Sequence, residues 1–355
     1  MQREIGSNFW LDPCAVYPRK TGLSPQIFHI SGSDYAWLST GRSAITYALR
    51  HIRSERAEKI AMLPSFTCHT VIEPFLNDGY EVVPYTINDD MTTSPALLLE
   101  TVAENRPNVL LFHHYFGFRT FSDVIADLSA RGVTVIEDRT QCLYSGFPQS
   151  GADFIVGSIR KWCGVPDGGF AVRKSGAFSD KPSVPDVALE QAKLTASYAK
   201  HRYICENCGE KSVFLQEYRK AEEILTAQNQ FYRISDTAKL VQLNLETDDL
   251  IQRRRNNFSV LLSHLRNKWN LPFSDLPDDA TPLYFPFFAE DRAQVQEQLR
   301  KNDIYAPIVW PKPAQYGALN AAAENLYEHL LCIPVDQRYD ADDMCRVLDV
   351  LEHLK

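Results

Sequence analysis

The chain has 355 residues, of which 45% are hydrophobic and 23% are charged, a balance typical of a globular protein with one large core and a smaller domain. Its formal net charge is -8 and it has no long run of Lys and Arg, which argues against nucleic acid as a main partner. It shows no signal-peptide pattern and no apolar run near ~18 residues, so we expect no membrane span and a cytoplasmic protein with reduced cysteines.

The stretch from about residue 37 to residue 175 alternates between helical and strand-like segments. Apolar residues recur every three or four positions in the helical segments, and short continuous apolar runs mark the strands. The expected helices are 42–56, 70–76, 95–104 and 121–130, and the expected strands are 59–63, 81–87, 109–113, 133–137, 154–157 and 169–172. This alternation predicts right-handed crossovers and a mostly parallel sheet, which binds its ligands at the carboxyl ends of the strands.

The second part of the chain has a different pattern, with charged helical stretches on both sides of Cys205 and Cys208. Because structural zinc needs four ligands and no second pair follows nearby, we interpret this pair as part of a turn and expect no metal site. The expected helices are 187–202, 211–227, 235–269, 291–302 and 341–354, and the expected strands are 283–288, 306–309 and 331–335. We therefore expect an N-terminal arm (1–34), a large domain (35–245) and a small C-terminal α+β domain (246–355).

An amine and a carboxylate follow two of the predicted strands. Lys161 comes after the strand 154–157 and precedes a turn that contains Gly168 and Gly169, and Asp138 ends the strand that begins near residue 133. These are the groups that pyridoxal phosphate (PLP) requires, because the lysine forms the Schiff base and the carboxylate keeps the pyridine nitrogen protonated. Most lysines that follow a strand are only solvated charges, so this interpretation depends on the surrounding sequence.

Polar residues also follow other predicted strands or open a helix. Arg42 and Ser43 start the first helix, where free backbone N–H groups, a hydroxyl and a guanidinium suit a phosphate group. The alternative is that Ser43 only caps the helix. Further segments of this kind are Pro64–Thr70, His114–Gly117 and Glu137–Gln141. No GxGxxG, Walker A, HExxH or GxSxG motif occurs, which removes the simplest nucleotide-binding, metalloprotease and hydrolase interpretations.

In their order and spacing these segments resemble the sugar aminotransferases of the DegT/StrS type, a PLP-dependent family of fold type I. The resemblance extends over most of the chain. The matching segments are Arg42–Ile45, Pro64–Thr67, His114–Gly117, Glu137–Gln141, Ser158–Lys161, Gly168–Gly169, Tyr232–Ser235, Arg255–Phe258, Ala306–Pro311 and Leu331–Pro334. No single motif is specific, but the order in which they occur is.

The resemblance implies an α/β fold with a large, mostly parallel PLP-binding domain and a smaller C-terminal α+β domain. It implies that Lys161 forms the Schiff base, that Asp138 pairs with the pyridine nitrogen and that Gln141 lies against the O3' side of the ring. The residues that it implies for the phosphate are Ser43, Arg42 and Ser158. It also implies a homodimer with the active site at the subunit interface.

The region around the lysine departs from the family pattern. Ser158 precedes Lys161 by three residues, where family members usually have five. Arg160 beside the lysine and Arg139 inside the acidic motif add positive charge. These differences indicate a divergent member of the family.

A second departure concerns the aromatic residue that stacks on the cofactor ring in the family. Its position is occupied here by Cys68. His69 or Phe66 would have to stack instead, and we favour His69.

The resemblance implies transamination, with glutamate or another common amino acid as donor and a nucleotide-linked keto sugar as acceptor, in surface-polysaccharide or secondary-metabolite synthesis. The departures keep two alternatives open. One is a PLP enzyme that catalyses elimination or dehydration, and the other is a catalytically silent relative that acts as a binding partner. The joint presence of Asp138, Gln141 and Lys161 argues against the silent relative.

Overall fold

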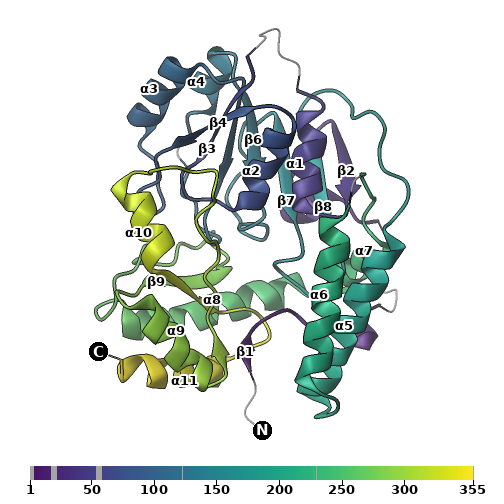
Figure 1. The fold of residues 1–355 in the computed structure, drawn as a ribbon, viewed down its shortest axis with the longest axis vertical. Helices are drawn as coiled ribbons and strands as arrows, with labels where there is room; N and C mark the ends of the chain where they lie inside the picture. The colour runs from purple at the N-terminus through teal and green to yellow at the C-terminus, as the bar shows by residue number, and fades with distance from the viewer. Residues whose placement is uncertain (1–3, 17–21, 53–57, 122, 229, 355) are drawn as a thin grey trace. The chain divides into compact units, whose positions relative to one another are not determined.

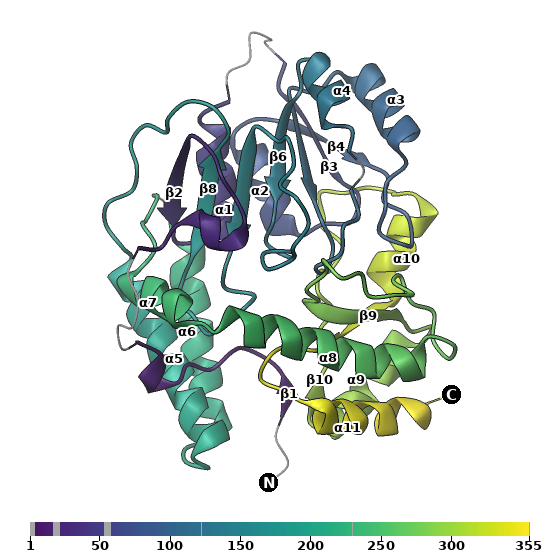
Figure 2. The same cartoon turned by 180° about the vertical axis from the view of Figure 1, so that it is seen from behind.

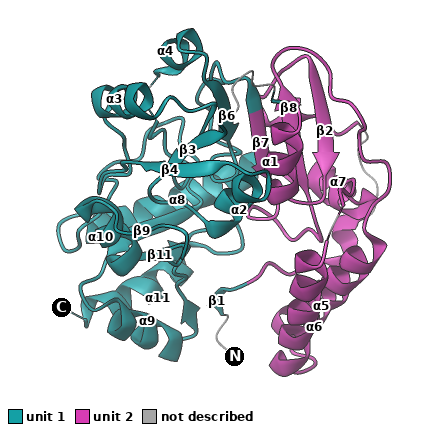
Figure 3. Ribbon diagram, turned by 45° about the horizontal axis from the view of Figure 1, so that its top comes forward, with its two compact units in different colours: residues 1–7, 52–154, 247–355 teal, residues 8–51, 155–246 magenta. Residues whose placement is uncertain are grey.

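The computed structural model of the chain describes residues 4–16, 22–52, 58–121, 123–228 and 230–354. The chain divides into two units, which have different colours in Figure 3. Unit 1 comprises residues 1–7, 52–154 and 247–355, and unit 2 comprises residues 8–51 and 155–246. Each unit has its own strands and helices.

Unit 1 contains four parallel strands, hydrogen-bonded in the order β6-β5-β3-β4. Their bounds are Ile60–Pro64 for β3, Glu81–Tyr85 for β4, Val109–His113 for β5 and Thr134–Asp138 for β6. Every residue of β5 is buried, as its continuous apolar sequence predicts for a strand that is covered on both faces. All four strands were expected from the sequence, with small shifts at their ends.

The helices between these strands are α2 (His69–Asn77), α3 (Pro95–Asn105) and α4 (Ile125–Ala130). Helix α2 lies in front of the strands in Figure 1 and behind them in Figure 2, so it covers one face of the sheet. Ser94 caps α3, because its side chain accepts the N–H of Leu97. Helix α4 is shorter than the expected helix 121–130, since the backbone of Val124, at φ -118° and ψ 14°, is not helical.

The C-terminal part of unit 1 is an α+β arrangement. Its helices are α8 (Thr247–Leu265), α9 (Arg292–Lys301), α10 (Ala321–His329) and α11 (Ala341–Glu352), and its strands are β9 (Tyr284–Phe288), β10 (Ile304–Tyr305) and β11 (Leu330–Pro334). Strands β9 and β11 are antiparallel, and β10 pairs in parallel with β1 (Ile5–Gly6). The strand expected at 306–309 is wrong, because Pro307 has no N–H for a strand ladder and pairing ends at Tyr305. Helix α10 was not predicted.

The described residues of unit 2 form strands in the order β2-β8-β7, of which β7 begins at Phe154, the last residue of that segment of unit 1. Their bounds are Asp34–Leu38 for β2, Gly169–Arg173 for β8 and Phe154–Ser158 for β7. Strand β2 is antiparallel to β8 and was not predicted. Helix α1 (Gly41–Leu49) packs on β8. It is shorter than the expected helix 42–56, of which residues 53–57 lie outside the described part of the chain.

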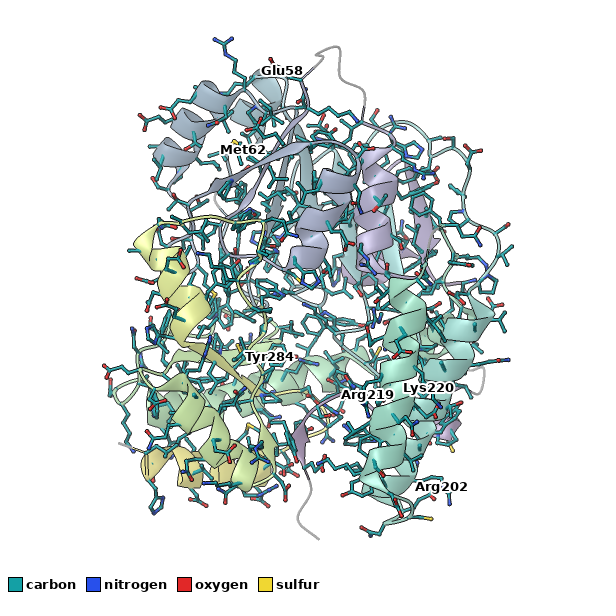
Figure 4. The ribbon with its side chains drawn as sticks, in the orientation of Figure 1. Glu58, Met62, Arg202, Arg219, Lys220 and Tyr284 are labelled. Atoms are coloured by element: carbon teal, nitrogen blue, oxygen red, sulfur yellow. The ribbon has the colours of Figure 1, made fainter. Side chains whose placement is uncertain are left out.

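Helices α5 (Val187–Cys205) and α6 (Lys211–Thr226) of unit 2 form an antiparallel hairpin, seen in Figures 1 and 2. Figure 4 labels Arg202 near its tip, and Arg219 and Lys220 on α6. Cys205 ends α5 and Cys208 lies in the connecting loop, so the pair belongs to a turn between helices, as expected. The apolar residues between the two helices are Leu189, Ala196, Phe214, Tyr218, Ala221 and Leu225.

The long helix expected from 235 to 269 is wrong, because it is divided into two helices. Helix α7 (Asp236–Asn244) stops before Leu245, whose ψ of 126° is extended, and α8 starts at Thr247. The break falls where the chain passes from unit 2 to unit 1.

The structure confirms the expected fold class, an α/β protein with a mostly parallel sheet and a smaller α+β arrangement. The expected domain boundaries after residues 34 and 245 stay a prediction. None of the helices in the described ranges is long and apolar enough to cross a lipid bilayer.

Candidate active site

The start of α1 in unit 2 carries two of the predicted phosphate-binding residues. Thr40 caps this helix, because its hydroxyl oxygen accepts the Ser43 N–H at 3.0 Å and its carbonyl accepts the Ala44 N–H. The N–H groups of Gly41 and Arg42 lie in the first turn, where helix geometry provides no acceptor. The capping residue is therefore Thr40, which leaves Ser43 available for another role.

The Ser43 hydroxyl oxygen lies 2.8 Å from the hydroxyl oxygen of Thr40. When Thr40 donates in this pair, Ser43 keeps its own proton for a phosphate oxygen. Together with the positive end of the helix dipole, this makes the start of α1 suitable for an anion. The Arg42 guanidinium donates through Nη2 to the Leu225 carbonyl at 3.5 Å, so it lies against α6.

Ser158, the third residue predicted to bind the phosphate, is buried at the end of β7. Its hydroxyl donates to the Gly168 carbonyl at 3.1 Å. Because a hydroxyl has one proton, Ser158 cannot donate to a phosphate while it keeps this bond. In this conformation Ser158 instead joins the two ends of the turn that carries Lys161.

The glycine pair after Lys161 allows a close approach of two backbone segments in unit 2. A Cβ on Gly169 would lie 2.2 Å from the Thr40 carbonyl oxygen. Gly168 has a φ of +134°, and its N–H donates to the Ser39 carbonyl at 2.6 Å. The turn after Lys161 therefore ends directly beside the start of α1.

Lys161 lies in the turn after β7 and is half-buried. Its neighbour Arg160 lies with Nη2 3.5 Å from Glu222 Oε1 on α6, and the same oxygen accepts a hydrogen bond from Lys193 on α5. Burial alone would raise the pKa of the Glu222 carboxyl, but the Lys193 hydrogen bond and the charges of Lys193 and Arg160 hold it below its usual value. The charge that Arg160 adds beside the lysine is thus partly offset by Glu222.

Asp138 and Gln141 lie on one short segment of unit 1, in which Asp138 is the last residue of β6 and Gln141 follows the strand. Asp138 is buried, and its Oδ1 accepts the Thr140 N–H at 2.9 Å. Gln141 is also buried, and its Oε1 accepts the Phe116 N–H at 2.7 Å, which fixes the orientation of the amide. The Gln141 amide nitrogen has no hydrogen-bond partner among the described residues. A buried donor of this kind is costly unless a ligand oxygen accepts from it.

Arg139, inside the acidic motif, is fully buried beside Glu137. Its Nε lies 3.5 Å from Glu137 Oε1, and its guanidinium carbon lies 5.0 Å from the centre of the Phe147 ring. Burial raises the pKa of the Glu137 carboxyl, and the charge of Arg139 opposes this shift. Because side chains alternate along a strand, Glu137 leaves β6 on the face opposite to that of Asp138, and Arg139, which follows the strand, lies beside Glu137.

His69 and Phe66, the two candidates for stacking on the ring, have different environments in unit 1. His69 is the first residue of α2 and is exposed. Phe66 is buried, and its ring stacks on Tyr115 at 5.7 Å between centroids. His69 can therefore reach a ligand, whereas Phe66 is part of the apolar core of unit 1.

The predicted residues fall into two sets. Unit 2 carries Arg42, Ser43, Ser158 and Lys161, and unit 1 carries His69, Asp138 and Gln141. Sequence reasoning missed Thr40, Asp167 and Ser235, which support the residues of unit 2. The preference for Thr directly before a helix could have identified Thr40 as the cap. No sequence pattern pairs Asp167 with Ser235.

No protein-family model matches the chain, and no curated protein sequence matches it. Solved structures do match it. Helicobacter pylori PseC, an aminotransferase involved in the biosynthesis of pseudoaminic acid, has a TM-score of 0.71 at 15% identity, covering 99% of this chain and 100% of that one. The chain has the fold of an aminotransferase.

Two further solved structures match the chain with similar TM-scores and similarly low identity. DesV of S. venezuelae, solved in complex with a ketimine intermediate, has a TM-score of 0.68 at 18% identity, covering 93% of this chain and 86% of that one. The sugar aminotransferase CalS13 from Micromonospora echinospora has a TM-score of 0.67 at 16% identity, covering 98% of this chain and 99% of that one. At sequence identities this low, the structural similarity establishes the fold alone.

Proposed function

We propose that the chain is a PLP-dependent sugar aminotransferase that resembles the DegT/StrS family. The observation that carries this proposal is the placement of two residues within a shared fold. Lys161 and Asp138 each follow the carboxyl end of a strand, and the aminotransferase fold extends over nearly the whole chain. Ligands of parallel α/β sheets bind at this edge.

Three features of the described residues fit PLP. The start of α1, with the Ser43 hydroxyl, suits a phosphate group. The buried Gln141 amide nitrogen, which has no partner in the described ranges, suits the ring oxygen of the cofactor. The Asp138 carboxylate and the Lys161 amine match the ring nitrogen and the aldehyde, respectively.

Bound PLP supplies an electron sink for the negative charge that develops when an amino acid loses its α-proton. Lys161 Nζ would hold the cofactor and would take up and return that proton as a general base and acid. The Asp138 carboxylate would keep a proton on the ring nitrogen. Gln141 Nε2 would donate to the ring oxygen, and Ser43 with the N–H groups of the first turn of α1 would bind the phosphate.

We propose glutamate or another common amino acid as the donor and a keto sugar, carried on a nucleotide, as the acceptor. PseC is described as an aminotransferase involved in the biosynthesis of pseudoaminic acid, and CalS13 as a sugar aminotransferase. These descriptions support a sugar as the amino acceptor. The family resemblance further supports a cytoplasmic homodimer with the active site at its interface, acting in polysaccharide biosynthesis. The partners are then small-molecule substrates, without nucleic acid or a membrane.

A PLP enzyme that catalyses elimination or dehydration is the second candidate. It is favoured by Cys68, which occupies the position of the stacking aromatic, and by the short spacing between Ser158 and Lys161. Both features alter the surroundings of the cofactor rather than the groups that bind it.

The full-length chain, purified with PLP, tests the proposal by its visible spectrum. We expect a band at roughly 410–430 nm that disappears when glutamate is added and returns when a nucleotide-linked keto sugar follows. A band that persists with every amino donor would favour the second candidate. The absence of any band, with PLP removed by gel filtration, would contradict both and favour a silent relative.

A further inference from the structure

A buried carboxylate closes the turn that carries Lys161. Asp167 is fully buried in unit 2 and faces Ser235, the residue that caps α7. The Ser235 N–H donates to both carboxylate oxygens at 3.1 Å, and the Ser235 hydroxyl donates to Oδ1 at 2.8 Å. The Asp167 carboxylate thus accepts hydrogen bonds from both donors of Ser235, its backbone N–H and its hydroxyl.

The same turn is closed on itself at its two ends. The Ile159 N–H donates to the Gly168 carbonyl at 3.2 Å, and the Ser158 hydroxyl donates to that carbonyl as well. The Gly168 N–H donates to the Ser39 carbonyl, immediately before the cap of α1. A side chain at Gly168 would collide with Ile159, since a Cβ would lie 2.4 Å from its Cγ1. The turn is therefore tightly shaped. Asp167 joins it to Ser235, the cap of α7, and the Cys163 thiol of the same turn donates to Gln242 Oε1 on α7 at 4.0 Å.

Charged groups surround this carboxylate on several elements. Arg160 of the same turn and Arg233 before α7 act on it with positive charge, and Glu190 of α5 acts with negative charge. Burial raises the pKa of the Asp167 carboxyl to about 7, although the hydrogen bonds from Ser235 oppose the shift. Asp167 therefore changes its charge near neutral pH in the closed turn.

We propose that Asp167 is a positioning residue, which holds the segment from Ile159 to Gly168 closed through Ser235 and thereby sets the place of Lys161. The role of Lys161 in binding PLP rests on the proposed function. The closed turn itself does not, because it is defined by the hydrogen bonds named above, each of which joins two residues of unit 2.

The protonation of Asp167 makes the closure depend on pH. In the open turn the carboxyl is solvated and has an ordinary pKa near 4, so between about pH 4 and 7 only the closed turn holds the proton. A rise of pH in this range therefore favours opening, by about tenfold per pH unit, and the effect levels off above about pH 7.

Hydrogen exchange of the full-length chain without added cofactor tests this inference. Protection factors for the peptide 159–168, which are corrected for intrinsic exchange, should fall as pH rises from about 5 to 7 and then stay level. Asp167→Asn keeps an acceptor for Ser235 but has no charge to titrate, so its protection factors should not change with pH. A wild-type peptide whose protection is independent of pH, or an unchanged pH dependence in Asp167→Asn, overturns the proposal.

A matched set of serine variants separates positioning from general stability. Ser235→Ala and Ser94→Ala each remove the cap of a helix, but only Ser235 contacts Asp167. We expect Ser235→Ala to lower the protection of peptide 159–168 at least about tenfold, Ser235→Thr to restore it, and Ser94→Ala to leave it unchanged. Equal loss of protection in both alanine variants contradicts the proposal.

The PLP-loaded protein distinguishes this inference from the proposed function. If the chain binds PLP, the cofactor should dissociate several-fold faster from Ser235→Ala than from Ser94→Ala. A chain that binds no PLP but shows the expected exchange refutes the proposed function and leaves the closure of the turn intact. Normal PLP binding without the expected hydrogen-exchange behaviour refutes the closure of the turn and leaves the proposed function intact.

Discussion

Asp138 is a buried carboxylate on the last residue of β6, and we expect it to act on the cofactor's ring nitrogen. Asp138→Asn keeps the size and one acceptor oxygen but cannot keep that nitrogen protonated. The variant should bind PLP and yet transfer the α-proton at least about a hundredfold more slowly, a loss of about 3 kcal/mol in the barrier. Single-turnover kinetics with a deuterated amino donor measure this step, and near-normal rates would remove Asp138 from the proposed site.

Ser43 and Thr40 have separable roles at the start of α1. Thr40 caps the helix, whereas the Ser43 hydroxyl is free to donate when Thr40 donates to it. Ser43→Ala should weaken PLP affinity about 10- to 150-fold, the loss of one charge-assisted hydrogen bond of about 1.5–3 kcal/mol. Thr40→Ala should instead lower the free energy of unfolding of the cofactor-free protein by about 1 kcal/mol. Titration with PLP and urea unfolding of both variants check this, and unchanged affinity in Ser43→Ala would contradict the phosphate site.

The candidate site residues Lys161, Asp138 and Gln141 were chosen because each lies at or after the end of an apolar strand and fits the family order. The structure places them at or after strand ends, and their roles stay a prediction. The hydrogen bond from Ser158 to Gly168 could not be predicted, since it depends on the exact shape of a glycine turn. The contact between Asp167 and Ser235 joins positions far apart in the chain, which local periodicity does not relate.

At the scale of elements, the continuous apolar strands were the easiest to predict. Strand β5 is an unbroken buried run, and its bounds agree with the expectation. Strand β2 mixes polar and aromatic residues and is defined by pairing with β8, so its own sequence is not distinctive. The apolar residues at 306–309 looked like a strand, but Pro307 prevents the pairing. The break between α7 and α8 comes from an extended Leu245, a residue that also suits a helix.

The turn between β5 and α4 should make stability depend on pH. His114 is buried, and its Nδ1 accepts the N–H groups of Thr120 and Phe121. Burial, together with the charge of Arg139, lowers the pKa of His114 to about 3. As pH falls, the unfolded state takes up a proton on His114 at a higher pH than the folded state does. The contribution of His114 to the free energy of unfolding is therefore complete above about pH 6.5. It decreases by about 1.4 kcal/mol per pH unit as pH falls towards 3.

His114→Asn tests this pH dependence, because its amide oxygen can replace Nδ1 as the acceptor while it does not titrate. Urea unfolding between pH 4 and 7 should show a smaller slope of the unfolding free energy for this variant than for the wild type. His264→Asn, at an exposed position of α8, serves as the control. Parallel pH curves for the wild type and His114→Asn would contradict the assignment.

A charge pair contributes to the hairpin of α5 and α6. Lys193 is buried on α5 and donates to Glu222 on α6, while burial and the charge of Arg160 lower the pKa of Lys193. Glu222→Gln leaves this ammonium without its carboxylate and should reduce the unfolding free energy by about 1–3 kcal/mol. Lys193→Met in the Glu222→Gln background should recover part of that loss, as urea unfolding can measure. A double variant less stable than Glu222→Gln alone would contradict this explanation.

At the scale of the whole molecule, the aminotransferase fold is retained although sequence identity to the compared structures is low. PseC matches almost every residue of the chain at 15% identity. The segments that resemble sugar-aminotransferase motifs lie mostly at the starts of helices and the ends of strands, where α/β folds bind their ligands.

The attachment of PLP to Lys161 is the most direct test of the account. The full-length chain, loaded with PLP, is reduced with borohydride and digested, and the modified peptide is identified by mass spectrometry. We expect the label on Lys161 alone, and we expect Lys161→Ala to fold normally, to take no label and to have less than about one per cent of wild-type activity. Lys174→Ala, which removes an exposed lysine just after β8, should be labelled like the wild type. A label on another lysine, or full activity in Lys161→Ala, would contradict the account.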